Sequence, residues 1–539
     1  MRPTTSSITS SRMLLSALCL VVTTACREPV SEHTGHHGPD ASLDGPCDGS
    51  ASVPVRRALA VITDFSDTSL EAWTGAGFNS VAEVRTQLDQ MSAHWSFLSR
   101  GTEAMQWDIV RVQLPQPFTD DAFAGANDFR DEVIRLAREQ IDPQDYDFDR
   151  DGVIDAVWII ASTNGRTVPW LLGGVTRNDG ANNFVDGQDS LSVRSGATGN
   201  FNHEVGHTRG LPDLYGDYST IAELSDMSNS WPVPPPDFCA YDRVHLGWAT
   251  PIVLAPGAQT ITVPPLTVYK VPTALPEEYF LIEYRKRPAS GFGSVSSFDY
   301  DGIVVYHVFE TSAQSIDPPL LEVVPADGAI AAQAPQTTDL FYPGNTAMVL
   351  PSVLRTYLGG DEVFRIVAVR AGELDIDVRP PGLGSSPNLI ANPGFEAGTT
   401  GWINGGYLPD QATFTWASIG ANGSSHSLSV ASTMPNDVEW STHLTGLPAN
   451  RSFYMCGYLR GVGVGGFEGS GAGANISISA TFVRTPGLYG TFDFTRACTI
   501  VIGDATTTDV ACRLGGLAAT STGQVWCDDV SYQLLDKVF

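Results

Sequence analysis

The sequence predicts an α+β protein with three consecutive regions: a mixed α/β domain, a β-rich extension and a C-terminal all-β sandwich. Three observations predict this order. Apolar strands alternate with amphipathic helices up to about residue 250, short β segments follow to about residue 378, and from Asn388 a stretch rich in Gly, Ser and Thr carries alternating apolar residues. A chain of 539 residues is too long for one hydrophobic core, and its 42% of hydrophobic residues can fill several.

The first region, residues 55–250, shows the clearest alternation of elements. The run "ALAVITDF" predicts a buried strand, and apolar residues spaced by three and four positions predict an amphipathic helix from Val81 to Leu98. A second strand, "WDIVRVQL", and a central third strand, "AVWIIAS", enclose a helix around Phe129 to Ala137. In the extension, residues 251–378, "YFLIEYRKR" and "GIVVYHV" are the clearest strands. A Pro/Gly/Ser linker at 379–387 separates the extension from the sandwich at 388–539.

Charge and the N-terminus indicate an exported protein. Sixty Asp and Glu residues against 31 Lys and Arg give a formal net charge of -29, which argues against nucleic acid as a partner. The apolar run Met13 to Ala25 is too short to span a bilayer and fits a signal peptide over residues 1–26. It ends in "VVTTAC", which resembles the lipobox of bacterial lipoproteins and makes Cys26 the expected lipidation site; ordinary secretion stays open. A polar tether, 27–54, follows, and membrane contact is expected only through a lipid anchor.

Six cysteines remain after the signal peptide and Cys26: Cys47, Cys239, Cys456, Cys498, Cys512 and Cys527. In an exported protein an even number suggests three disulfides. We expect two of them within the sandwich and one between Cys47 and Cys239. No two of these cysteines have CxxC spacing, so a structural zinc knuckle is not expected.

The stretch "FNHEVGHTRGLPDLYG" predicts a metal centre. His203 and His207 are four residues apart and therefore lie on one face of a helix, where both can bind one metal ion, for which zinc is the expected choice. Glu204 can act as the general base for an attacking water. Gly210 allows a sharp turn out of the helix, after which Asp213 can supply the third ligand. Glu223 is the alternative third ligand, ranked second because its segment is less helical and soon reaches a proline.

The chain resembles the immune inhibitor A family of secreted bacterial metallopeptidases over about residues 58–345. The resemblance rests on the blocks "DYDFDRDGVIDAVWIIAS", "HEVGHTRGLPDLYG", "DMSNSW", "YDRVHLGW", "EYFLIEYRKR", "DGIVVYHV" and "TTDLFYPGN". It implies a zinc endopeptidase acting on protein or peptide substrates, with His203 and His207 as ligands and Glu204 as base. The HExxHxxGxxD spacing is similar to that of metzincins, and Met227 stands where these enzymes have the methionine of their Met-turn.

Two residues depart from the family pattern: Arg209 replaces a smaller or apolar residue, and Asn202 replaces an alanine. Two other functions remain open. One is a surface lipoprotein without peptidase activity that binds glycans or proteins. The other is a zinc hydrolase that acts on glycopeptides, because the zinc chemistry is the same for both kinds of bond.

The acidic string Asp147, Asp149, Asp151 and Asp155, with a glycine at 152, has the oxygen-ligand spacing of a calcium loop. Position twelve of such a loop is Trp158, so the bidentate glutamate of an EF-hand is missing. The string predicts either a calcium site completed by distant residues or a solvated acidic turn.

The last region resembles jelly-roll carbohydrate-binding modules through "NLIANPGFEAGTTGW" at its start and "VWCDDVSYQLL" at its end. The resemblance implies a structural calcium near Glu396 and Asp529. Four aromatic residues are candidates for a platform that stacks on sugar rings: Trp402, Tyr407, Trp416 and Trp440. The alternative for these aromatic residues is the core of the sandwich.

Overall fold

The computed structural model describes most of the chain after residue 52. The described residues are 53–72, 79–119, 121–124, 126–148, 150, 154, 156–162, 197–215, 221–230, 232, 234–294, 301–310, 318–329, 335–381, 386–466, 472–503, 505–517 and 519–535. The predicted signal peptide, its Cys26 and the tether up to residue 52 lie outside them.

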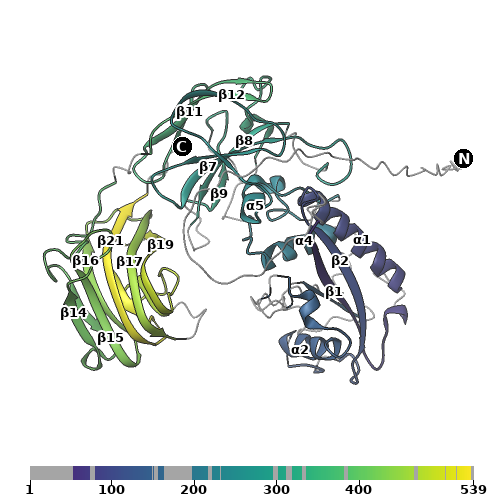
Figure 1. The fold of residues 1–539 in the computed structure, drawn as a ribbon, viewed down its shortest axis with the longest axis horizontal. Helices are drawn as coiled ribbons and strands as arrows, with labels where there is room; N and C mark the ends of the chain where they lie inside the picture. The colour runs from purple at the N-terminus through teal and green to yellow at the C-terminus, as the bar shows by residue number, and fades with distance from the viewer. Residues whose placement is uncertain are drawn as a thin grey trace, which may run out of the picture. The chain divides into compact units, whose positions relative to one another are not determined.

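The N-terminal region contains a parallel three-stranded sheet in the order β2-β1-β3. Figure 1 shows β1 and β2 side by side. The predicted strands and helices are confirmed. The strands are β1 (Val55–Asp64), β2 (Ala104–Gln113) and β3 (Val157–Ala161), and the helices are α1 (Val81–Leu98), α2 (Ala126–Ala137), α4 (Ala197–Thr208) and α5 (Ala240–His245).

The central strand β1 is apolar on both faces because both faces are covered. Ala60 and Ile62 pack in the same core as residues of α1 and α4. Leu59 and Val61 point to the other face and pack with residues of α2. The helix α4 is thereby fixed against the sheet and α1, which makes it a rigid base for side chains on its opposite face.

The extension consists of two sheets, in the orders β4-β6-β7-β8-β9 and β10-β11-β12-β5. Among the described strands of these two sheets, β4 and β6 pair in parallel and the other pairs are antiparallel. The strands are β4 (Ile252–Val253), β5 (Gly257–Thr262), β6 (Val268–Pro272), β7 (Glu278–Arg285), β8 (Gly302–Phe309), β9 (Leu321–Val323), β10 (Ser352–Arg355), β11 (Glu362–Arg370) and β12 (Glu373–Val378). Apolar residues of both sheets, such as Ile282 and Phe364, share one core.

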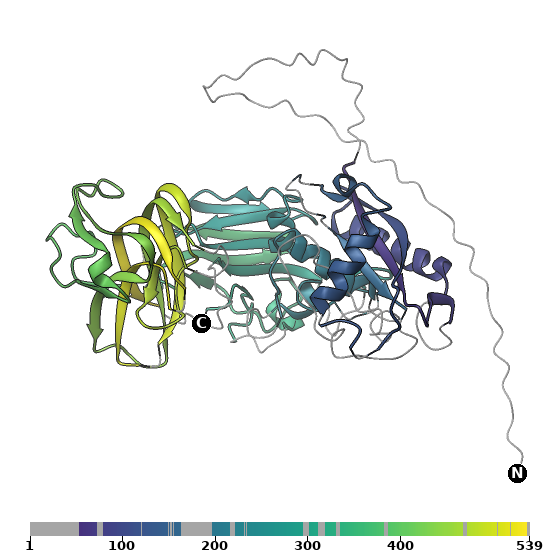
Figure 2. The ribbon, with the colours of Figure 1, turned by 90° about the horizontal axis from the view of Figure 1, so that it is seen from below.

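The C-terminal region is an antiparallel sandwich of two sheets, β13-β16-β20-β18 and β14-β15-β21-β17-β19, whose long strands are seen in green and yellow in Figure 2. The strands are β13 (Ile403–Gly406), β14 (Thr413–Ala417), β15 (Ser427–Asn436), β16 (Val438–Thr445), β17 (Arg451–Gly465), β18 (Ala474–Ile478), β19 (Gly490–Gly503), β20 (Thr507–Leu514) and β21 (Ser521–Leu534). One apolar core fills the space between the sheets.

The two disulfides predicted for the sandwich are confirmed: Cys456 bonds to Cys498, and Cys512 bonds to Cys527. The predicted bond between Cys47 and Cys239 is not formed. Cys239 is a free and fully buried cysteine at the start of α5, enclosed by the core of the first region, while Cys47 lies outside the described residues. Disulfides are typical of proteins exported to an oxidising compartment.

Among the described residues, no helix is both long and apolar enough to cross a membrane.

Candidate metal centre

The helix α4 and the turn after it bring His203, His207 and Asp213 together. The chain leaves α4 through Gly210, whose φ of +82° suits glycine. Oδ1 of Asp213 lies 3.2 Å from Nε2 of His203 and 3.1 Å from Nε2 of His207, and the two Nε2 atoms are 3.2 Å apart. These residues could hold a metal ion, and no second group of three His, Cys, Asp or Glu side chains with this property is found in the described part of the chain.

Backbone carbonyls set the orientation of both imidazoles. Nδ1 of His203 lies 3.0 Å from the carbonyl oxygen of Asp226, and Nδ1 of His207 lies 2.8 Å from that of Leu211. A carbonyl oxygen can only accept, so each Nδ1 carries the hydrogen. In the neutral ring each Nε2 then keeps a lone pair, which faces the other imidazole and Asp213. This is the arrangement in which histidines bind metal ions. The predicted ligand set is therefore assembled with Asp213 as its carboxylate.

The electrostatics of the three side chains favour a bound cation. Burial opposes the ionisation of Asp213, but the two histidines beside it together outweigh burial and lower its pKa well below the usual range. Burial also opposes the charging of His207, yet Asp213, the carbonyl of Leu211 and Glu204 together outweigh it and raise the pKa of this imidazole. A cation must displace the proton that His207 would otherwise hold, so binding is expected to weaken in acid.

Met227 lies against α4 beside the ligands and is fully buried. A side chain at Gly206 of α4 would place its Cβ 2.6 Å from Sδ of Met227, so the glycine makes room for the methionine. The backbone N–H of Leu214 donates to the carbonyl of Met227 at 2.9 Å. The turn that carries Met227 is thus bonded to the segment that carries Asp213.

Three polar residues that the sequence analysis did not single out hold this turn. Ser225 Oγ donates to Asp242 of α5 at 2.5 Å and accepts from the N–H of Met227 at 3.0 Å. Arg285, at the end of β7, donates to the carbonyl of Leu224 at 2.8 Å. Asp242 and Arg285 belong to the blocks "YDRVHLGW" and "EYFLIEYRKR", and Ser225 directly precedes the block "DMSNSW".

Glu204 and Glu223, the other two candidate residues of the predicted site, are not members of this group of three. Glu204 follows His203 on α4 and is half-buried. Glu223, the alternative ligand, lies in a short 3-10 helix, Ala222–Leu224, and does not belong to the group that could hold a metal. The ring of Tyr215 is stacked 6.0 Å from that of His203 and is 48% exposed.

The two departures from the family pattern have structural partners. Arg209 forms an ion pair with Glu103 at 2.8 Å, and Glu103 also accepts from Arg56 at 3.0 Å, so the end of α4 is tied to the start of β2 and to β1. Asn202 donates to the backbone carbonyl of Met91 at 3.1 Å and to Nδ1 of His94 at 3.0 Å, which ties α4 to α1. Both residues therefore position α4.

The candidate calcium ligands are not assembled among the described residues. Asp147 ends a short 3-10 helix, while Asp149, Asp151 and Asp155 lie outside the described residues. In the sandwich, Glu396 Oε1 accepts the backbone N–H groups of Ser425 and His426 at 2.8 and 2.9 Å. Asp529 accepts instead from Asn422 at 3.2 Å. Glu396 and Asp529 thus use carboxylate oxygens in hydrogen bonds within the protein.

The four candidate aromatic residues do not form one platform. Trp402 and Trp440 are 4% and 6% exposed and belong to the core of the sandwich, as the alternative predicted. Tyr407 and Trp416 are 71% and 45% exposed. Trp416 points to the same face of its strand as core residues do and is held at the rim by a 2.8 Å hydrogen bond to the carbonyl of Phe395.

Comparison with known proteins finds likeness in the sandwich fold. No protein-family model matches the chain, and no curated protein matches it. Among solved structures, TmCBM61 in complex with β-1,4-galactotriose is similar at 17% identity, over 28% of this chain and 99% of that one, with a TM-score of 0.20. The CBM22-1 xylan-binding domain of Paenibacillus barcinonensis Xyn10C is similar at 14% identity, over 29% and 99%, with a TM-score of 0.20.

A further similar structure is the enzymatically active domain of tailspike protein 4 from bacteriophage CBA120. It matches at 14% identity over 29% of this chain, with a TM-score of 0.22, and the match covers only 23% of the tailspike chain. The C-terminal region of the protein resembles carbohydrate-binding modules in fold.

Proposed function

We propose that the protein is an exported zinc endopeptidase. The observation that carries the proposal is the convergence of two Nε2 atoms and one carboxylate oxygen within 3.2 Å of one another, with both Nδ1 atoms held by backbone carbonyls. Two imidazoles and a carboxylate form a donor set suited to catalytic zinc. The resemblance to immune inhibitor A peptidases supports the same reaction.

His203, His207 and Asp213 would hold the zinc, which would polarise the scissile carbonyl and lower the pKa of a water. Glu204 lies on the same helix, next to His203, and serves as the general base. It takes a proton from the water that attacks the carbonyl carbon and passes it to the leaving amine as the peptide bond breaks. The Nδ1 hydrogen bonds keep both imidazoles turned with Nε2 towards Asp213 during this transfer.

The test is hydrolysis of casein by the full chain and by its Glu204→Ala variant, with zinc content measured in both. We expect the variant to keep its zinc and to lose at least about a hundredfold in kcat, the range for removal of a general base. Glu223→Ala is the matched control and should keep both zinc and activity. Equal activity of Glu204→Ala and the wild type would contradict the mechanism. Cleavage of glycosylated mucin but not casein would favour a hydrolase of glycopeptides.

We propose glycan binding as a second function, located on the sandwich. On the exposed face of the five-stranded sheet, Arg460 of β17 pairs with Trp526 of β21 in register, and its guanidinium lies 5.1 Å from the centre of the indole ring. Tyr458 precedes Arg460 on the same face, and both it and Trp526 are partly exposed. Aromatic rings beside a fixed cation and polar groups suit a sugar chain.

The test is calorimetric titration of the full chain with β-1,4-galactotriose and with xylan oligosaccharides. Trp526→Ala should abolish any binding found, while Trp416→Ala, which removes the exposed tryptophan at the rim, should leave it unchanged. Binding that survives Trp526→Ala, or no binding of either sugar by the wild type, would count against this surface.

A further inference from the structure

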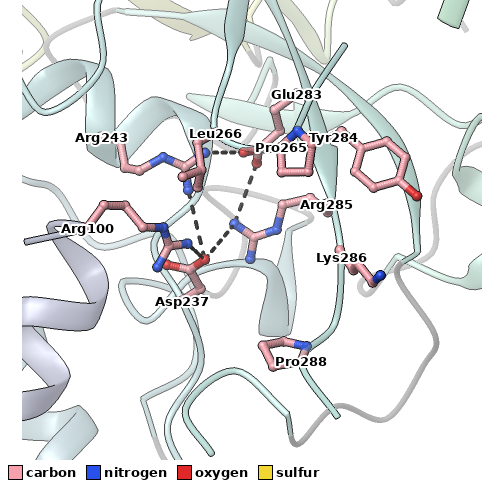
Figure 3. Close-up of a pocket in the computed structure, with 10 residues that line it drawn as sticks. All are labelled: Arg100, Asp237, Arg243, Pro265, Leu266, Glu283, Tyr284, Arg285, Lys286 and Pro288. Atoms are coloured by element: carbon pink, nitrogen blue, oxygen red, sulfur yellow. Dashed lines mark hydrogen bonds and ion pairs between the residues drawn. The ribbon is translucent and has the colours of Figure 1, made fainter. Parts of the chain in front are cut away.

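A small pocket lies among the end of α1, the loop before α5, the turn between β5 and β6, and β7 (Figure 3). Its lining is unusual for this acidic protein because cations outnumber anions. Six charged side chains contribute: Arg100, Arg243, Arg285 and Lys286 against Asp237 and Glu283. In a chain with a formal net charge of -29, this pocket carries a surplus of two positive charges.

The two carboxylates do not neutralise this surplus, although the carbonyl of Phe238 also accepts from Arg243 at 2.8 Å and from Arg285 at 2.7 Å. Asp237 hydrogen-bonds to Arg100, whereas its carboxylate lies 4.0 Å from Arg243 and 3.8 Å from Arg285, beyond hydrogen-bond distance. Glu283 hydrogen-bonds to Arg243 and is 3.6 Å from Arg285. Burial opposes the ionisation of Asp237, but the surrounding guanidinium groups outweigh it and lower its pKa, so both signs of charge are present at neutral pH.

The pocket also has a buried donor without an acceptor. The side chain of Arg243 is 4% exposed, and its Nε has no hydrogen-bond partner among the described residues. Leaving a buried charged donor unsatisfied is costly. Lys286 also lines the pocket, is exposed and adds an ammonium group to the lining. Pro265 and Leu266 add apolar side chains to the lining.

We propose that this pocket binds an oxyanion, either a phosphate or the carboxylate of a small organic acid, between the arginine cluster and Lys286. Guanidinium groups present planar donors that match carboxylate and phosphate oxygens, and ammonium groups attract either anion. None of the lining residues belongs to the His203, His207 and Asp213 group, so the site is separate from the proposed metal centre.

Occupancy of the pocket bears on the metal centre through two backbone contacts. Arg285 donates to the carbonyl of Leu224, and the N–H of Asp226 donates to the carbonyl of Asp237 at 3.0 Å. The carbonyl of Asp226 in turn accepts from His203. An anion that fixes Arg285 and Asp237 therefore also fixes the acceptor that orients His203.

The experiment is calorimetric titration of the full chain with inorganic phosphate and, separately, with N-acetylglycine, using sodium chloride at equal ionic strength as the reference. We expect saturable binding of one or both probes, and the probe that binds identifies the source of the oxyanion. Lys286→Gln should weaken the affinity by about fivefold, the upper range for an exposed charge. Arg370→Gln removes an exposed cation on the other sheet of the extension and should leave the affinity unchanged.

Titration of the Asp213→Ala variant separates this site from the metal centre. Unchanged phosphate affinity in Asp213→Ala is expected, whether or not the protein is a peptidase. Loss of binding in this variant would place the anion at the metal centre and overturn the proposal. Failure of both probes to bind the wild type, or equal affinity in Lys286→Gln, would also overturn it.

Discussion

His94 should make the stability of the protein depend on pH. Its side chain is fully buried in α1, with Nε2 2.9 Å from the carbonyl of Pro236 and Nδ1 3.0 Å from the side-chain amide of Asn202. The carbonyl accepts from Nε2–H, and Nδ1 accepts from Asn202, so the neutral ring satisfies both bonds. A proton added to Nδ1 would find no acceptor there, because the Asn202 amide is itself a donor. Burial lowers the pKa of His94 to about 4.

The magnitude follows from the difference between the folded and unfolded pKa values. In the unfolded chain His94 titrates at its ordinary value of 6.5, and in the folded chain at about 4. Between these two pH values His94 binds a proton in the unfolded chain but not in the folded chain. Its contribution to the free energy of unfolding is therefore complete above pH 6.5 and is lost as the pH falls towards 4. A difference of about 2.5 units corresponds to about 3 kcal/mol in the free energy of unfolding.

The assay is urea unfolding at a series of pH values for the wild type and for His94→Gln, both freed of metal. Glutamine does not titrate, so all other groups cancel in the difference between the two proteins. We expect His94→Gln to be less stable at pH 7.5 and the gap to shrink by about 1.4 kcal/mol per pH unit below about 6.5. A gap that stays constant from pH 7.5 to 4.5 would refute the reasoning, because His94 would then titrate alike in both states.

Two further predictions concern stability. Arg209→Met removes the ion pair that ties the end of α4 to Glu103, while Arg56 still neutralises this carboxylate. We therefore expect the free energy of unfolding in urea to fall by about 1–2 kcal/mol. An unchanged free energy of unfolding would show that Arg209 does not position α4. Replacing Cys512 and Cys527 by alanine opens a loop of 15 residues and should cost the sandwich about 3 kcal/mol, seen as a lower midpoint of thermal unfolding, whereas an unchanged midpoint would show that the bond adds nothing.

Much of the fold could be predicted from the sequence because its signals are local. The apolar runs at β1, β3 and β8 lie in strands buried on both faces, and the spacing of three and four residues in α1 follows directly from helix geometry. The group of His203, His207 and Asp213, which could hold a metal ion, was predictable for the same reason, since its members all lie within eleven residues.

Features that depend on contacts between distant segments were not predictable. Asp242 bonds to Ser225, and Arg285 bonds to the carbonyl of Leu224, because α5 and β7 pack beside the turn before Met227. The aromatic residues of the sandwich divide between core and surface according to strand register, which a sequence without defined strand boundaries does not give. The even number of cysteines predicted a disulfide for Cys239, but this cysteine is free and enclosed by the core.

The most direct test of the metal centre is the number of zinc ions per chain, measured by elemental analysis of the purified full chain, Asp213→Ala and Glu223→Ala. The structure predicts one tightly bound ion in the wild type and in Glu223→Ala, and loss of tight binding in Asp213→Ala. A wild type that binds no zinc, or an Asp213→Ala variant that keeps its zinc while Glu223→Ala loses it, would contradict the assignment of His203, His207 and Asp213 as the ligands.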